Sequence, residues 1–175
     1  MLIQRQDIPS PALRPSGASG VQRPAGEVRR ESHLATLPPL NGASDEQCAV
    51  FQRVFQRSGG LATSDALALF MRSQCDQPVS MLARWIVRKH LVCLVWRSQT
   101  LIPMFQFDLA HCSVRAGMPE IIVELHAALD DFETIEWFAR PNCWLAGAAP
   151  ADVVPTDIQA VLEAARADRF VSLGG

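Results

Sequence analysis

The chain has 175 residues, 49% of them hydrophobic, and a formal net charge of −2 at pH 7. This length suits one domain with a tail, or two very small domains, and the apolar share is large enough to build a core. The slight negative charge excludes a nucleic-acid binder that acts through bulk positive charge, although it leaves room for a local basic patch.

The first forty residues have the composition of a tail. They hold six of the twelve prolines, several glycines and serines, and few aromatic or β-branched residues. Such a segment buries too little apolar surface to offset the entropy that it loses on ordering. We therefore predict that residues 1–43 are disordered or loosely ordered. Five arginines outnumber three acidic residues here, which also suits a weak arm for a partner or nucleic acid, but a solvated tail is the simpler interpretation.

Capping signals predict two helices after the tail. Ser44 and Gln47 form a capping box that begins the first helix, and a pair of glycines at 59–60 ends it. Either Thr63 or Ser64 caps a second, shorter helix.

A third helix is predicted from Pro78, a residue well suited to the first helical position. Helical spacing predicts that its core face consists of Val79, Leu82, Ala83 and Ile86. The other face carries a basic stripe, and arginine pairs with guanine edges and with phosphates. The candidate DNA-binding residues are Ser80, Arg84, Arg88 and Lys89. Trp85 in this stripe is unusual for a groove, so the alternative is that it packs on the following hairpin and the arginines are merely solvated.

Two apolar runs follow the third helix and flank the sequence Arg-Ser-Gln-Thr, which predicts a β-hairpin. Pro103 cannot donate a ladder hydrogen bond, so we expect its strand to lie at an edge or to be broken there. Three helices and a hairpin in this order look like a small winged helix. We therefore predict a winged-helix-like unit over residues 44–110.

The rest of the chain is predicted to be helical. Pro119 begins one helix, Pro141 must stop another, and Pro150 starts a further turn. Thr156 and Gln159 form a second capping box that opens the terminal helix. Its apolar stripe consists of Ile158, Val161, Leu162 and Ala165. The fold class is therefore mainly α, with a C-terminal helical domain over residues 111–175.

Side chains suited to catalysis or metal binding are few. The four histidines have no metal-ligand spacing, and the five cysteines include no C-x-x-C pair. No glycine-rich phosphate loop or nucleophile-elbow motif is present. We therefore expect no enzyme activity, no metal, no cofactor and reduced thiols. The start of the chain has no apolar run typical of a signal peptide, and no segment is long enough to span a membrane, so we expect a cytoplasmic protein without membrane contact.

The segment WFARPNCWLAGAAPADVV, residues 137–154, is rich in aromatic residues and prolines but poor in reactive groups. It resembles the core signature of the Xre/MbcA/ParS toxin-binding family: a Trp-Phe pair, Pro-Asn, an aromatic residue, leucine, glycine and a helix-opening proline. The matching residues are Trp137, Phe138, Pro141, Asn142, Trp144, Leu145, Gly147 and Pro150. Residues 102–108 and the terminal helix are also similar to the family, so the resemblance covers roughly residues 60–173.

The resemblance implies the antitoxin of a bacterial type II toxin–antitoxin system, whose C-terminal helix neutralises a RES-domain toxin that degrades NAD. The candidate toxin-binding residues are Trp144, Glu163, Arg166, Asp168, Arg169 and Phe170. In this hypothesis Asp168 pairs with a phosphate-binding arginine of the toxin, while Arg166 and Arg169 meet acidic groups at its rim. The alternative for this face is simple solvation. Trp137 and Phe138 are expected to belong to the core.

A second function, from a different class, is compatible with the sequence. The unit before residue 102 is shorter than the Xre-type DNA-binding domain of the family, but it still suits a DNA-binding transcriptional regulator without a toxin partner. A neighbouring toxin gene favours the antitoxin, and an isolated gene with a palindromic upstream site favours the regulator. A homodimer, or a hetero-oligomer with the toxin, is expected, and operator DNA is a possible further partner.

Overall fold

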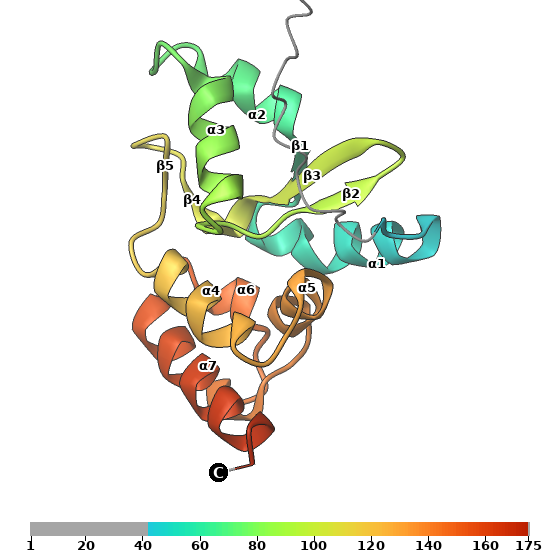
Figure 1. Ribbon diagram of the computed structural model, residues 1–175, viewed down its shortest axis with the longest axis vertical. Helices are drawn as coiled ribbons and strands as arrows, with labels where there is room; N and C mark the ends of the chain where they lie inside the picture. Colours follow the sequence, from blue (N-terminus) through green and yellow to red (C-terminus); the bar gives the residue numbers. More distant parts are fainter. Residues whose placement is uncertain (1–41, 175) are drawn as a thin grey trace, which may run out of the picture. The chain divides into compact units, whose positions relative to one another are not determined.

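The computed structural model describes residues 42–174 (Figure 1). The tail predicted over residues 1–43 therefore lies outside the described residues, except for its last two. The described part is mostly helical with a small sheet of three antiparallel strands, so the expectation of a mainly α protein is confirmed. Among residues 42–174 no helix is both long enough and apolar enough to cross a membrane.

The elements follow one another in a simple order (Figure 1). The first part of the described chain contains α1 (Asp45–Phe55), β1 (Leu61–Thr63), α2 (Ser64–Met71), α3 (Pro78–Val87), β2 (Leu94–Trp96) and β3 (Gln99–Pro103). The second part contains β4 (Phe107–Asp108), β5 (Ser113–Val114), α4 (Met118–His126), α5 (Asp131–Ala139), α6 (Pro150–Val153) and α7 (Ile158–Ser172). Three short 3-10 turns connect these elements: η1 (Gln56–Ser58), η2 (Met104–Gln106) and η3 (Cys143–Leu145).

Side-chain caps fix where the first helices begin. Ser44 Oγ accepts a hydrogen bond from the Gln47 amide at 3.2 Å, and Gln47 Oε1 accepts one from the Ser44 amide at 2.8 Å. The predicted capping box of α1 is therefore confirmed. Thr63 Oγ1 accepts from the amide three residues later at 3.1 Å, so Thr63, and not Ser64, caps α2. After α1, Gly59 has a φ of +106°, a conformation that glycine adopts without strain.

The predicted hairpin is present as β2 and β3, joined by Arg97 and Ser98. Both turn residues have positive φ, +46° and +63°, as a two-residue type I′ turn requires. β3 lies between β1 and β2, so the expectation of an edge strand at Pro103 is wrong. The expected break there is confirmed, because β3 ends at Pro103. The strand that was not predicted is β1, because its three residues are too few to show a strand pattern in the sequence.

The core face predicted for α3 is only partly correct. Leu82 is buried, but Val79 is 63% exposed and Ala83 is also exposed. Trp85 packs instead, with its ring centroid 6.0 Å from that of Phe107, as the alternative for this residue expected. A large indole removes more apolar surface from water than valine and alanine do, which favours this rotation of the helix.

The start of α7 also differs from the prediction. Asp157 Oδ1 accepts a hydrogen bond from the amide three residues later at 3.0 Å, while the Thr156 hydroxyl donates backward to a carbonyl. The capping box of Thr156 and Gln159 is therefore wrong, and Asp157 is the cap. A carboxylate interacts more favourably than a hydroxyl with the positive end of the helix dipole. The predicted apolar stripe is confirmed: Val161, Leu162 and Ala165 are buried and Ile158 is partly buried.

Aromatic rings join the two parts of the described chain in one core. Phe105 lies between Phe55 of α1 and Phe138 of α5, with centroid distances of 5.5 and 4.8 Å. All three rings are buried, and their cluster contains residues from both sides of residue 110. The predicted helical domain is therefore packed on the same core as the sheet.

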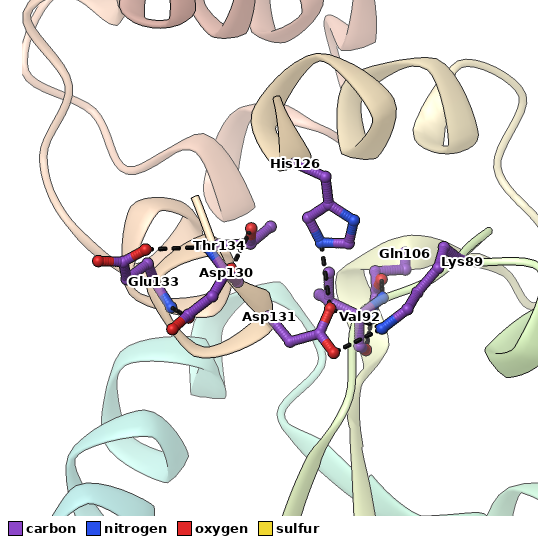
Figure 2. Close-up of polar contacts among 8 residues, drawn as sticks. All are labelled: Lys89, Val92, Gln106, His126, Asp130, Asp131, Glu133 and Thr134. Carbon is purple, nitrogen blue, oxygen red and sulfur yellow. Dashed lines mark hydrogen bonds and ion pairs between the residues drawn. The ribbon is translucent and has the colours of Figure 1, made fainter. Parts of the chain in front are cut away.

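Gln106 is a fully buried polar side chain at the centre of this structure. Its Oε1 accepts a hydrogen bond from the Val92 amide at 2.7 Å, and its Nε2 donates to the carbonyls of Val92 and Pro103 at 2.9 and 3.0 Å. The side chain thereby satisfies backbone groups at the entry to β2, where no strand partner does so (Figure 2). Buried backbone groups of this kind are rarely left without partners.

Replacing Gln106 with leucine is expected to lower the free energy of unfolding by about 2–4 kcal/mol, because two buried groups of Val92 lose their partners. Urea unfolding measures this change. Gln99→Leu is the matched control, since Gln99 is exposed on β3, and it should change the free energy by no more than about 0.5 kcal/mol. Equal effects of the two variants would contradict the role given to Gln106.

Candidate functional site

One carboxylate joins the terminal helix to the aromatic segment that precedes it. Asp168 of α7 accepts at Oδ2 from Trp137 Nε1 and from Asn142 Nδ2, both at 2.7 Å, and at Oδ1 from Trp144 Nε1 at 2.8 Å. The donors lie on α5, in the loop after it and in η3. Hydrogen bonds to an ionised acceptor are roughly twice as strong as neutral ones. We call these four residues the Asp168 hub.

Hydrogen bonds within the loop that follows α5 also fix its shape. Asn142 is 7% exposed, and its Oδ1 accepts from the Trp144 amide at 2.9 Å. Its backbone carbonyl accepts from the Gly147 amide at 2.9 Å. Ala146 and Gly147 turn the chain with φ of +54° and +82°. Pro141 follows the end of α5, as predicted, so a proline, an asparagine and a glycine together set the path of the loop.

The hub leaves one of its aromatic rings on the outside. Trp144 is 56% exposed, although its indole N–H is bound within the chain. Three further apolar side chains at the end of α7 are exposed: Phe170, Val171 and Leu173, by 66%, 66% and 63%. We call Trp144 and these three residues the terminal patch. Val171 lies about one helical turn beyond Asp168 on the same side of α7.

The Trp-Phe pair of the same segment behaves differently. Phe138 is fully buried, and Trp137 is partly buried with its ring edge-on to Phe138 at a centroid distance of 5.1 Å. The expectation that these two residues belong to the core is therefore confirmed.

Most charged residues predicted to meet a toxin have partners inside the chain. Arg166 Nε and Arg169 Nη1 lie 3.1 and 2.6 Å from the carboxylate of Glu124 on α4. The Glu124 side chain is only 16% exposed, so this pair of contacts is partly shielded from water. Asp168 accepts the three hydrogen bonds of the Asp168 hub. The remaining predicted charge, Glu163, is exposed.

The basic face of α3 is open to solvent. Ser80, Arg84 and Arg88 are all exposed, and α3 contains no acidic residue. Two arginines four residues apart lie on one side of a helix. This face therefore offers positive charge without an acidic neighbour on the same helix.

Lys89 does not share that face, because it links the end of α3 to the start of α5 (Figure 2). Its Nζ donates to both carboxylate oxygens of Asp131, at 2.8 Å to Oδ1. His126 Nε2 lies 3.2 Å from the same oxygen without making a hydrogen bond. Burial lowers the pKa of His126, and the charge of Asp131 opposes that effect. Lys89 thus links α3 to α5 through a partly exposed ion pair.

Reactive side chains are dispersed over the described part of the chain. Within residues 42–174, no group of three or more His, Cys, Asp or Glu side chains is placed to hold a metal ion. Asp108 and His111 form a pair at 2.7 Å beside a hollow of about 400 Å³, and the hydrogen bond from His111 lowers the pKa of Asp108. Burial raises the pKa of Cys93 to about 11, so this thiol stays protonated near neutral pH.

Three residues have roles that the sequence did not indicate. Glu124 pairs with α7, Asp131 pairs with Lys89, and Asn142 connects the loop to Asp168. Their partners lie 26 to 45 residues away along the chain. Of these three residues, only Asn142 could have been singled out from the sequence, because it lies in the aromatic segment.

The site is an exposed aromatic and apolar surface beside charges that are paired within the chain, an arrangement suited to contact with another macromolecule. Comparison of the chain with family models, curated proteins and solved structures found no match. The choice of a partner therefore depends on the residues themselves.

His126 gives the described structure a pH dependence with a definite sign. Because its pKa is lowered from 6.5 in the folded chain, the unfolded chain takes up a proton first as the pH falls. The resulting stability is fully present above pH 6.5 and is lost as the pH falls from that value through the lower pKa of the folded chain. We expect His126→Gln to lose less unfolding free energy than the parent between about pH 7.5 and pH 5.5, measured by urea unfolding. Parallel losses in the two proteins would contradict this assignment.

Proposed function

We propose that the chain is a bacterial antitoxin that neutralises a RES-type, NAD-degrading toxin by direct binding through its C-terminal helix. The observation that carries this proposal is the Asp168 hub. Three residues of the segment that resembles the toxin-binding family, Trp137, Asn142 and Trp144, are joined to α7 by hydrogen bonds. The family-like segment and the terminal helix therefore form one unit.

The contact with the toxin is proposed to be mainly apolar. Asp168, Arg166 and Arg169 have intramolecular partners, so an ionic contact with the toxin would first have to break these interactions. Aromatic side chains that are fixed on a frame and exposed are typical binding anchors. We therefore place the centre of the interface on the terminal patch, with Glu163 and the paired arginines at its rim.

Trp144→Ala and Phe170→Ala are each expected to weaken toxin binding at least tenfold, since truncated aromatic anchors commonly cost about 2 kcal/mol or more. The measurements are toxin affinity by calorimetry and inhibition of toxin NAD consumption. Val50→Ala is the matched control, because Val50 is an exposed apolar residue on α1. Full inhibition by both variants at stoichiometric amounts would place the interface elsewhere.

A second function is favoured by a separate observation, the order of the elements. The order α1-β1-α2-α3-β2-β3, with strands arranged β1-β3-β2, supports the proposal that this part is winged-helix-like. α3 then takes the place of a recognition helix, and its exposed face carries Ser80, Arg84 and Arg88. We therefore keep operator binding, by an antitoxin or by a regulator without a toxin partner, as the alternative. Lys89 is expected to contribute through its ion pair with Asp131 and not through DNA.

The double variant Arg84→Ala/Arg88→Ala is expected to weaken operator binding and to reduce the slope of log affinity against log salt by up to about 1.8, because each phosphate contact contributes about 0.9. Fluorescence anisotropy over a range of salt concentrations measures both effects. Arg53→Ala/Arg57→Ala, which changes two exposed arginines outside α3, is the matched control. An unchanged slope, or no operator binding by the parent, would exclude α3 as a recognition helix.

A further inference from the structure

The third hydrogen bond of the Asp168 hub, which Trp144 donates, holds an exposed aromatic ring. The bonds from Trp137 and Asn142 already attach the loop to α7. An exposed indole N–H can donate to water almost as well, so its bond to Asp168 contributes little to folding. What this bond does fix is the direction in which a ring that is 56% exposed stands.

A second contact restrains the same ring from its backbone. The Trp144 amide donates to Asn142 Oδ1 at 2.9 Å, and Asn142 Nδ2 donates to Asp168 at 2.7 Å. Both ends of the Trp144 residue are therefore tied, directly or through Asn142, to one carboxylate. Phe170, Val171 and Leu173 have exposed side chains within five residues of that carboxylate, and of these Val171, three residues on, shares its side of α7.

We infer that Asp168 is a positioning residue for partner binding, which holds the Trp144 indole ready to enter an apolar pocket of the toxin. The inference rests on the proposed function. A side chain that is already ordered loses less entropy on binding, and for one residue this is worth about two- to tenfold in affinity. The partner surface that fits is apolar, because the neighbouring charges of α7 are compensated by Glu124 and by the hub.

Two other roles for Asp168 lead to different results. If Asp168 pairs directly with a cation of the toxin, its removal weakens binding whatever residue stands at position 144, and the loss decreases at high salt. If Asp168 only stabilises the loop, its removal weakens binding through Trp137 and Asn142, again independently of the Trp144 indole. Positioning requires the Trp144 N–H, so its effect disappears when that donor is absent.

A double-mutant cycle on toxin affinity separates these roles. Its four members are the full-length parent, Asp168→Ala, Trp144→Phe and the double variant, each measured by calorimetry with the RES-type toxin of the proposed function. We expect Asp168→Ala to weaken binding about two- to tenfold in the parent and less than about twofold in the Trp144→Phe background, where no donor remains. An equal loss in both backgrounds would overturn the inference. If Asp168→Ala fails to fold, Asp168→Asn takes its place, since its amide oxygen still accepts a bond from the loop.

A measurement on the free protein makes the inference independent of the toxin. NMR relaxation of the Trp144 indole N–H should give an order parameter near the 0.85 of rigid backbone in the parent, and below about 0.6 in the Asp168 variant. The Trp96 indole, whose N–H donates to Asp45 and not to Asp168, serves as an internal reference. Equal order of the Trp144 indole in both proteins would overturn the inference. A parent with an ordered indole that binds no RES toxin would instead refute the proposed function alone.

Discussion

The carboxylate of Asp168 is the constraint on which the C-terminal part of the structure depends. Trp137, Asn142 and Trp144 all donate to it, so the path of the loop after α5 and the placement of the last turns of α7 are set by one acceptor. A carboxylate can accept up to about four hydrogen bonds, which is why a single side chain can hold three donors at once. Because one of these donors belongs to an exposed ring, the same interaction that closes the loop also shapes the surface.

The charged side chains of α7 also have partners within the chain. Two arginines that the sequence places on an outer face of α7 converge on Glu124, and Lys89 at the end of α3 converges on Asp131. Because these charged groups are paired within the chain, they stabilise the fold and are less available for binding. A partner would have to replace interactions that already exist. α7 exposes apolar side chains at its end beside Glu163 and the half-exposed, paired Arg166. α3 exposes Arg84 and Arg88 beside Val79 and Val87. This difference in chemistry is the reason for proposing a protein partner at one surface and DNA at the other.

The two surfaces lie over two core clusters: α7 packs on the cluster that contains Phe105, and α3 packs on the cluster that contains Phe107. Phe105, close after the hairpin, contacts Phe55 of α1 and Phe138 of α5, and Gln106 beside it satisfies the backbone at Val92. Val114 packs against both clusters and so connects them.

The sequence by itself determined the local features of this protein. The capping box of α1, the hairpin with its turn at Arg97 and Ser98, the end of β3 at Pro103 and the apolar stripe of α7 depend on residues a few positions apart, whose geometry is set by the backbone. The tertiary structure decided the rest: the strand that flanks β3, the rotation of α3 that partly buries Trp85, and the partners of Asp168, Arg166 and Lys89. Those interactions join residues 24 to 42 positions apart. No local preference specifies them, because which donor meets which carboxylate is settled only when the helices pack around the core.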